Sequence, residues 1–214
     1  VDIANGSIIE ESLLKKLNVS SGIILGNWGN PSASSYYPSF QEIPYLYMKY
    51  GIGPSAVCTT REKTGVGAPQ GWLVQETAKR SKTKFISDGG VTTPGDFCKA
   101  IALGADVVMS GRIFAGSKES NGDVISINGK WYKKYYGMAS KEVKKDKNDY
   151  VEGTIGYVPY EDKSAADILT EFEHGLKSSM SYCDAINLTQ YREHADICTV
   201  TNTTLKETYT RVTN

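Results

Sequence analysis

The chain has 214 residues, with 24 basic and 24 acidic side chains and 40% hydrophobic residues. This size and apolar content suit one globular domain. A net charge of zero argues against a nucleic-acid partner, because such proteins carry an excess of basic side chains. No apolar run reaches the ~20 residues that span a bilayer, and no secretory signal is recognisable. We therefore expect a cytoplasmic protein without a membrane partner.

The four cysteines, Cys58, Cys98, Cys183 and Cys198, lack CxxC spacing. Their arrangement is typical neither of a zinc site nor of a disulfide framework. We expect reduced thiols.

Short apolar or β-branched runs alternate with helical patterns along the first half of the chain. The expected strands cover residues 1–4, 22–25, 45–50, 84–87 and 106–109, and the expected helices cover 8–17, 71–80 and 94–103. Because the run at 1–4 is typical of the end of a buried strand, the chain is expected to begin in mid-domain. The alternation predicts parallel βαβ units.

Glycine-rich loops follow four of these strands, beginning at Gly26, Gly51, Asp88 and Gly111. The carboxyl ends of parallel strands lie on one face, so these loops should lie together. That is the layout of a (β/α)₈ TIM barrel, which needs eight strands where this pattern offers five. We therefore predict an α/β fold in which residues 1–214 form the C-terminal part of a single barrel domain, with about five βα units.

The second half of the chain begins with a hairpin signal. Residues 124–127 and 131–135 flank Asn128-Gly129, a strong two-residue turn. The polar stretch 141–150 lacks apolar periodicity and suits a mobile flap. We place a hairpin and flap insertion at about 117–153. The remaining expected elements are a helix at 165–176 and a short strand at 196–201.

The segment Gly51-Ile-Gly-Pro-Ser-Ala-Val-Cys-Thr-Thr-Arg61 is the most specific feature of the sequence. It places Cys58 on a bent loop after a strand, close to the hydroxyl of Thr60 and the cation of Arg61. Positive charge and oriented amides stabilise a thiolate, so Cys58 is a candidate nucleophile. The alternative for any cysteine is a small buried thiol, and we assign it to Cys98 and Cys183.

Asp88-Gly89-Gly90 and Gly111 follow the next two strands. Glycines allow backbone N–H groups to approach a phosphate, and an aspartate can accept hydrogen bonds from ribose hydroxyls. A lone Asp-Gly-Gly usually marks only a turn. Its position between the cysteine loop and a second glycine turn favours nucleotide binding.

In their order along the chain, these motifs resemble the IMP dehydrogenase/GMP reductase family over about residues 2–204. Further matching segments are Lys63-Thr-Gly-Val-Gly67, Pro94-Gly-Asp96, Gly104-Ala-Asp106, Phe114-Ala-Gly116, Glu119-Ser120 and Tyr136-Gly-Met138. The resemblance implies a (β/α)₈ barrel, usually a homotetramer, that forms a covalent nucleotide intermediate on the loop cysteine.

The flap separates the two branches of this family. Dehydrogenases carry a long flap with an Arg-Tyr pair that activates water, whereas here a short stretch without arginine separates Gly137 from Val151. The resemblance is therefore closest to the reductase branch, in its short-flap bacterial form. It implies NADPH-dependent reductive deamination of GMP to IMP. The alternatives are NAD-dependent oxidation of IMP to XMP, and a nucleotide-binding barrel or fragment without turnover.

Carried over residue by residue, the resemblance makes Cys58 the nucleophile at C2 of the purine. Thr60 and Glu152 become the pair that moves protons to the departing ammonia. The implied substrate-binding residues are Asp88, Gly89, Gly90, Gly111, Arg112, Gly137, Met138 and Ala139. The implied NADPH contacts are Asp2, Ile3, Ala4, Ile52 and Gly53, with Ser178, Ser179, Met180 and Ser181 reaching a neighbouring subunit's cofactor. The implied ligands of a monovalent cation such as K⁺ are the backbone carbonyls of Gly53, Ser55, Cys58 and Arg61.

Three positions depart from the family's usual pattern. Ser55 replaces a glycine, and the neighbouring Ala56 lacks the hydroxyl that normally contacts phosphate. Loss of one hydrogen bond to a charged group costs about 1.5–3 kcal/mol. Arg112 stands where Gly or Ser is usual. Its guanidinium would either restore complementarity to the phosphate or block the pocket.

Overall fold

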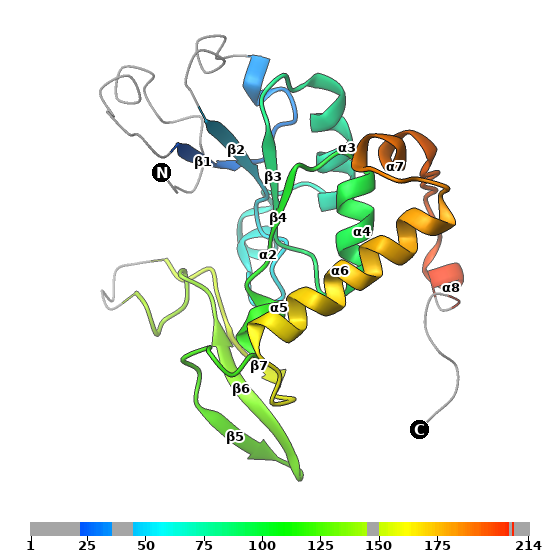
Figure 1. The fold of residues 1–214 in the computed structure, drawn as a ribbon. Coiled ribbons are helices and arrows are strands. Elements are labelled where there is room, and N and C mark those ends of the chain that lie inside the picture. Colours follow the sequence, from blue (N-terminus) through cyan, green and yellow to red (C-terminus); the bar gives the residue numbers. More distant parts are fainter. Residues whose placement is uncertain (1–21, 36–44, 145–149, 206, 208–214) are drawn as a thin grey trace.

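The computed structural model describes residues 22–35, 45–144, 150–205 and 207 (Figure 1). The strand expected at 1–4 and the helix expected at 8–17 lie outside the described residues, as does part of the expected flap, residues 145–149. In the described part of the chain, no helix combines the length and the apolar character needed to cross a membrane.

Four parallel strands form the main sheet. Their order is β1-β2-β3-β4, with bounds β1 (Ile23–Trp28), β2 (Leu46–Tyr50), β3 (Phe85–Asp88) and β4 (Val107–Met109). Helix α3 (Gln70–Arg80) links β2 to β3, and α4 (Pro94–Ala102) links β3 to β4. The α/β fold with a parallel sheet is therefore confirmed. Two short helices between these strands were not predicted, namely η2 (Ala33–Ser35) and α2 (Thr60–Thr64).

The core lies where the sheet meets α3. Leu25, Met48, Tyr50 and Leu73 are completely buried there, and Val74 is 1% exposed. Burial raises the pKa of Tyr50 to about 12. The two outer strands also carry exposed apolar side chains, because Ile24 of β1 and Met109 of β4 are both 49% exposed. Both edge strands of the parallel sheet therefore have exposed apolar side chains.

A second sheet is antiparallel and has the order β5-β6-β7. Its strands are β5 (Val124–Ile127), β6 (Lys130–Tyr136) and β7 (Ile155–Pro159). Asn128 and Gly129 have φ angles of 52° and 76°, the left-handed pair that a two-residue hairpin turn requires. The hairpin prediction is confirmed, whereas β7 was not predicted. We call β5–β7 the hairpin sheet.

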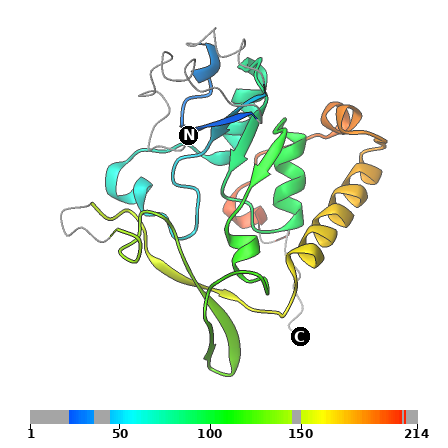
Figure 2. The same ribbon diagram turned by 60° about the vertical axis from the view of Figure 1, so that its left-hand side comes forward.

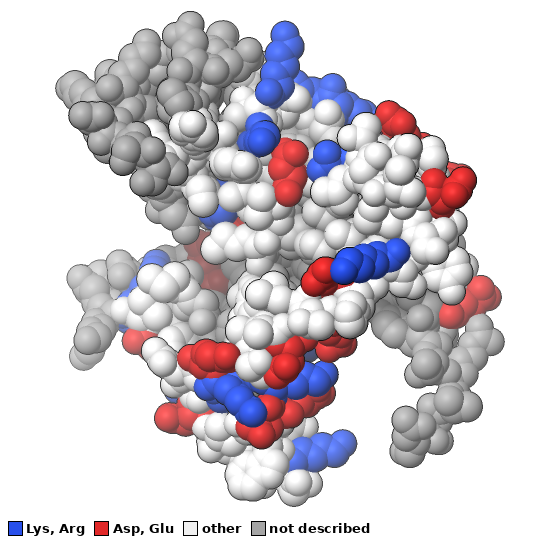
Figure 3. Space-filling view, viewed as in Figure 1, with Lys and Arg blue, Asp and Glu red and all other residues white. Residues whose placement is uncertain are grey.

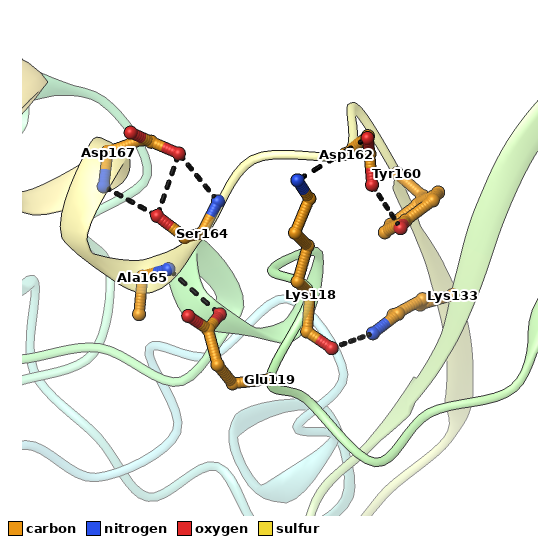
Figure 4. A network of polar contacts seen from close by, with 8 residues as sticks. All are labelled: Lys118, Glu119, Lys133, Tyr160, Asp162, Ser164, Ala165 and Asp167. Carbon is orange, nitrogen blue, oxygen red and sulfur yellow. Dashed lines mark hydrogen bonds and ion pairs between the residues drawn. The ribbon is translucent and has the colours of Figure 1, made fainter.

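The hairpin sheet is tied to its surroundings through Lys133 of β6, which is 3% exposed. Its ammonium donates to the carbonyls of Ser117 at 2.6 Å, Ser120 at 2.7 Å and Lys118 at 3.3 Å, in the turn after α5 (Arg112–Ala115). Glu119 of the same turn accepts a hydrogen bond from the N–H of Ala165, where α6 begins (Figure 4). Charged side chains of both signs cover this region (Figure 3).

Helix α6 (Ala165–Tyr182) lies along the outer side of α4 (Figure 2). Gly175 permits the close approach, because a Cβ there would lie 2.7 Å from Cβ of Pro94. The last helices, α7 (Leu188–His194) and α8 (Asn202–Leu205), were not predicted. The strand predicted at 196–201 is wrong, since that segment has no regular secondary structure. Residues 197–199 instead line a groove together with residues of α3 and α4.

Candidate active site

A cavity of about 250 Å³ lies where the loops after β2 and β3 meet two segments of the hairpin sheet, the one that follows β6 and the one that precedes β7. The residues that line it are Asn27, Gly51, Gly53, Pro54, Ser55, Val57, Cys58, Asp88, Gly89, Gly137, Met138, Ala139, Glu152 and Gly153. The cavity thus combines segments that are far apart in the sequence.

Glycines let the two strand-end loops touch each other. Gly51 has a φ of +152°, and a Cβ there would lie 2.2 Å from the carbonyl oxygen of Asp88. Gly89 has a φ of +82°, and a Cβ there would lie 2.8 Å from Cγ of Pro54. Neither position tolerates a side chain, so the glycine motifs found in the sequence shape the cavity wall directly.

The segment that carries Cys58 pairs with the chain that returns from the flap. The N–H of Thr59 donates to the Glu152 carbonyl, and the N–H of Thr154 donates to the Val57 carbonyl, both at 2.8 Å. Cys58 and Gly153 form an antiparallel bridge between these bonds. The pairing holds Cys58 beside Glu152, although the two residues are 94 positions apart in the sequence.

Three side chains form a continuous line of hydrogen bonds beside the cavity. The thiol of Cys58 donates to Oγ1 of Thr60 at 3.2 Å, and Thr60 donates to Oε2 of Glu152 at 2.5 Å. A thiol, a hydroxyl and a carboxylate in this order can pass a proton from sulfur to a carboxylate. The structure therefore brings together the three residues predicted to be catalytic.

The four cysteines have different surroundings. Cys58 lines the cavity, Cys98 is buried, Cys183 is partly buried and Cys198 is exposed. Burial raises the pKa of Cys98, which disfavours its thiolate. Cys98 therefore fits the structural role that the sequence assigned to it.

The predicted substrate-binding residues fall into two groups. Asp88, Gly89, Gly137, Met138 and Ala139 line the cavity, whereas Gly90, Gly111 and Arg112 do not. The exposed side chain of Arg112 lines a separate cavity of about 310 Å³ at the start of α4 and α6. The phosphate role of Arg112 stays a prediction to which this side-chain position adds no support.

The residues predicted to bind NADPH are also divided. Gly53 lines the cavity, while Asp2, Ile3 and Ala4 lie outside the described residues. The carbonyl of Ile52 accepts a hydrogen bond from Nε of Arg61 at 2.9 Å. Ser178, Ser179, Met180 and Ser181 lie on α6, where the Ser179 hydroxyl is 2.7 Å from that of Tyr191. The structure does not bring these α6 residues to the Cys58 cavity.

Arg61 also holds the loop after β2 by a second bond, from its guanidinium to the carbonyl of Ala68. The guanidinium of Arg61 therefore binds backbone carbonyls of the loop, and it does not hydrogen-bond to Cys58. Of the carbonyls predicted to bind a monovalent cation, that of Ser55 accepts the Cys58 N–H at 3.1 Å and that of Arg61 accepts the Gly65 N–H at 3.0 Å. Each keeps a second lone pair, so the cation site stays a prediction.

Sequence analysis did not identify three polar residues of this region, namely Lys49, Asn27 and Tyr135. Lys49 of β2 is 4% exposed, and its ammonium lies 2.5 Å from Oδ2 of Asp88 and also donates to Oδ1 of Asn27. The Tyr135 hydroxyl lies 3.4 Å from that of Ser55. A Cβ at Gly111 would lie 3.1 Å from the same Tyr135 oxygen. The available signal for Lys49 was a charged residue inside an otherwise apolar strand.

The chain resembles known proteins over most of its length. Residues 13–210 match the model of the IMP dehydrogenase / GMP reductase domain. The chain is 39% identical over 206 residues to a GMP reductase of Clostridium acetobutylicum, covering 89% of the chain and 60% of the relative. It is 40% identical over 199 residues to a GMP reductase of Bacillus subtilis, covering 90% and 59%.

A dehydrogenase is similar to the same degree. The chain is 39% identical over 179 residues to an inosine-5'-monophosphate dehydrogenase of Borreliella burgdorferi, covering 76% of the chain and 44% of the relative. The chain thus spans at most about three fifths of the length of these relatives. A family match over nearly all of the chain, together with these identities, shows that the chain belongs to the IMP dehydrogenase/GMP reductase family of oxidoreductases.

Proposed function

We propose that this chain forms the catalytic region of a GMP reductase, which converts GMP to IMP and releases ammonia. The observation that carries the proposal is the line of hydrogen bonds from Cys58 through Thr60 to Glu152 at the cavity. Reductive deamination needs both a nucleophile and a group that protonates a leaving amine, and this line provides both.

The residues divide the chemistry as follows. The Cys58 sulfur, after its proton passes through Thr60 to Glu152, attacks C2 of the purine and forms a C–S bond. Glu152 returns a proton through Thr60 to the amino group, which leaves as ammonia. NADPH, when bound, supplies the hydride that reaches C2. The C–S bond then breaks, and its electron pair returns to the Cys58 thiolate.

The cavity wall fits a nucleotide and a flat cofactor ring. Asp88 offers carboxylate oxygen to ribose hydroxyls, and Gly89 and Gly137 offer backbone close to the ligand. Gly53 adds no side chain to the wall beside Cys58, which suits close approach of the nicotinamide there. Tyr135 would offer phosphate the hydroxyl that Ala56 lacks, since it lies near both Ser55 and Gly111.

The reductase assignment over the dehydrogenase rests on the flap. The stretch from Gly137 to Glu152 contains no arginine, so it offers no guanidinium to activate water. A reductase needs no such group, because the intermediate accepts hydride instead of water.

We further propose that the parallel sheet is part of a (β/α)₈ barrel and that the enzyme is a homotetramer. We also propose that K⁺ binds the backbone carbonyls of Gly53, Ser55, Cys58 and Arg61. The exposed apolar residues of β1 and β4 support the barrel, since parallel strands are normally covered on both faces. Each of these features follows from the family and stays a prediction.

Assays in both directions on the purified protein test the function. NADPH oxidation with GMP, accompanied by ammonia release, is the expected result. NAD reduction with IMP and no reaction with GMP would replace the reductase by a dehydrogenase, and activity in neither direction would favour a binding domain without turnover.

Alkylation rates of the individual cysteines, followed by mass spectrometry, test the nucleophile. Cys58 should react faster than Cys98, whose pKa is raised by burial, and GMP should protect Cys58 alone. Cys198→Ala is the matched control, because this exposed thiol lies outside the cavity and its loss should leave turnover unchanged. Preferential protection of another cysteine by GMP would contradict the assignment.

A further inference from the structure

Three neighbouring strands place polar side chains in one contact at the edge of the cavity. Lys49 of β2 lies between Asn27 of β1 and Asp88 of β3. Its ammonium donates to the amide oxygen of Asn27 and to a carboxylate oxygen of Asp88. Lys49 itself is 4% exposed and does not line the cavity, whereas Asn27 and Asp88 both do. A buried ammonium is thus placed directly behind two groups that line the cavity.

The backbone is arranged to make this contact. Gly26 pairs with Lys49 and Trp28 pairs with Tyr50, so Asn27 is an extra residue in β1 at a shift of register. A bulge of this kind turns a side chain to the other face of a sheet, here toward Lys49. Gly26 adds room, because a Cβ there would lie 2.9 Å from Cβ and 3.1 Å from Cε of Lys49.

The contact fixes what each partner can offer to a ligand. An ammonium only donates hydrogen bonds, so Asn27 must turn its oxygen toward Lys49 and keeps its NH₂ group for other acceptors. Asp88 gives Oδ2 to Lys49, and among the described residues its Oδ1 has no hydrogen-bond partner. The cavity wall therefore presents an acceptor at Asp88 and a donor at Asn27.

We propose that Lys49 is a positioning residue that sets this polarity and thereby makes the site selective for a ribose that carries its hydroxyl groups. The inference rests on the proposed function, because it takes the ligand to be a purine ribonucleotide. Lys49 holds one carboxylate oxygen so that the other meets the ribose hydroxyls. The same ammonium keeps the Asn27 donors directed away from Asp88.

Equilibrium binding of GMP and of 2',3'-dideoxy-GMP to wild type and variants tests the inference. Wild type should prefer GMP by at least about tenfold, the worth of a hydrogen bond to a charged group. Lys49→Met should reduce this preference to within about threefold. Lys49→Arg keeps a charged donor and should recover most of the preference.

Lys133→Met is the matched control, because Lys133 is equally buried but its acceptors are backbone carbonyls outside the cavity. The Lys133→Met variant should keep the full preference for GMP over 2',3'-dideoxy-GMP, even if its free energy of unfolding is lower. Should Lys49→Met fail to fold, Lys49→Gln decides, because it retains one neutral donor and should show an intermediate preference. A full GMP preference in a folded Lys49→Met or Lys49→Gln variant would overturn the inference.

The outcomes separate this inference from the proposed function. Wild type that binds and converts GMP, with variants whose preference is unchanged, overturns the role of Lys49 alone. Wild type that binds neither nucleotide overturns the proposed function and the ribose selectivity together.

Discussion

Lys49 and Lys133 are buried to almost the same extent, at 4% and 3% exposed, yet their ammonium groups have different kinds of partner. Lys49 contacts the side chains of Asn27 and Asp88, which line the Cys58 cavity. Lys133 contacts three backbone carbonyls in the turn after α5, and its ammonium also lies 5.2 Å from the ring of Tyr160. Figure 4 shows Lys133 with Tyr160 and with the carbonyl of Lys118.

The difference separates residues that shape the ligand site from residues that hold the fold. A buried charge is costly unless it is fully hydrogen-bonded, so both lysines must be satisfied. At Lys133 the bonds join two segments of backbone and are complete within the protein. At Lys49 they leave Asp88 with an oxygen unused among the described residues, which is the condition for binding something else.

Glu152→Gln should give the largest effect and belongs to the ligand side of this comparison. The amide cannot accept the Cys58 proton through Thr60, so kcat should fall about a hundredfold while the GMP dissociation constant stays within about threefold. Steady-state kinetics and equilibrium binding measure the two quantities. Glu161→Gln, at an exposed carboxylate paired with Lys163, is the control and should change neither. Equal losses of affinity and turnover would place Glu152 in the binding wall instead.

Lys133→Met should act on the other side of the comparison, lowering the free energy of unfolding by about 2 kcal/mol. The change leaves three inward-facing carbonyls without their donor, and the relieved desolvation of the ammonium offsets part of the loss. Urea denaturation measures the effect, and turnover well below the unfolding transition should stay within about twofold of wild type.

Lys118→Met provides the control for this variant, because the exposed Lys118–Asp162 pair at 3.4 Å should contribute no more than about 0.5 kcal/mol. If Lys133→Met unfolds at the same urea concentration as wild type, the hairpin sheet is held by its other contacts. A marked loss of GMP affinity would show that the two regions are coupled.

The sequence predicted the elements whose patterns are local. The four strands of the parallel sheet, α3, α4 and the hairpin at Asn128-Gly129 all follow from periodicity and turn chemistry. The strand expected at 196–201 failed because a strand also needs a partner strand, and among the described residues this segment pairs with none. Strand β7 was missed because its pairing with β6 is set across the intervening flap.

The site shows the same division. Cys58, Thr60 and Glu152 were predicted from the family's motifs, and the structure brings them together. Lys49 and Asn27 belong to no motif, since their contact depends on a register shift between two strands. Such a shift is a property of paired backbones and leaves little trace in the residue types of either strand.

The smallest expected effect concerns Asp96, a carboxylate that serves the fold, in contrast to Asp88 at the end of the preceding strand. Asp96 accepts hydrogen bonds from the N–H groups of Thr92 and Thr93 and from the Thr92 hydroxyl, and so caps the start of α4. Burial alone would raise the pKa of Asp96, but these bonds together lower it below its ordinary value of 3.8.

A pKa that is lower in the folded than in the unfolded protein means that ionised Asp96 stabilises the fold. This contribution is complete above the ordinary carboxyl range and is lost as the pH falls through the lowered pKa of the folded state. Asp96→Asn should therefore reduce the free energy of unfolding by about 1 kcal/mol at neutral pH. The gap from wild type should close as the pH is lowered below 3.8, and urea denaturation across this range measures it. Asp196→Asn is the control, because the described part of the chain offers that exposed carboxylate no partner, and it should stay within about 0.5 kcal/mol of wild type at every pH. A gap for Asp96→Asn that stays constant with pH would mean that the cap acts through hydrogen-bond geometry alone, without its charge.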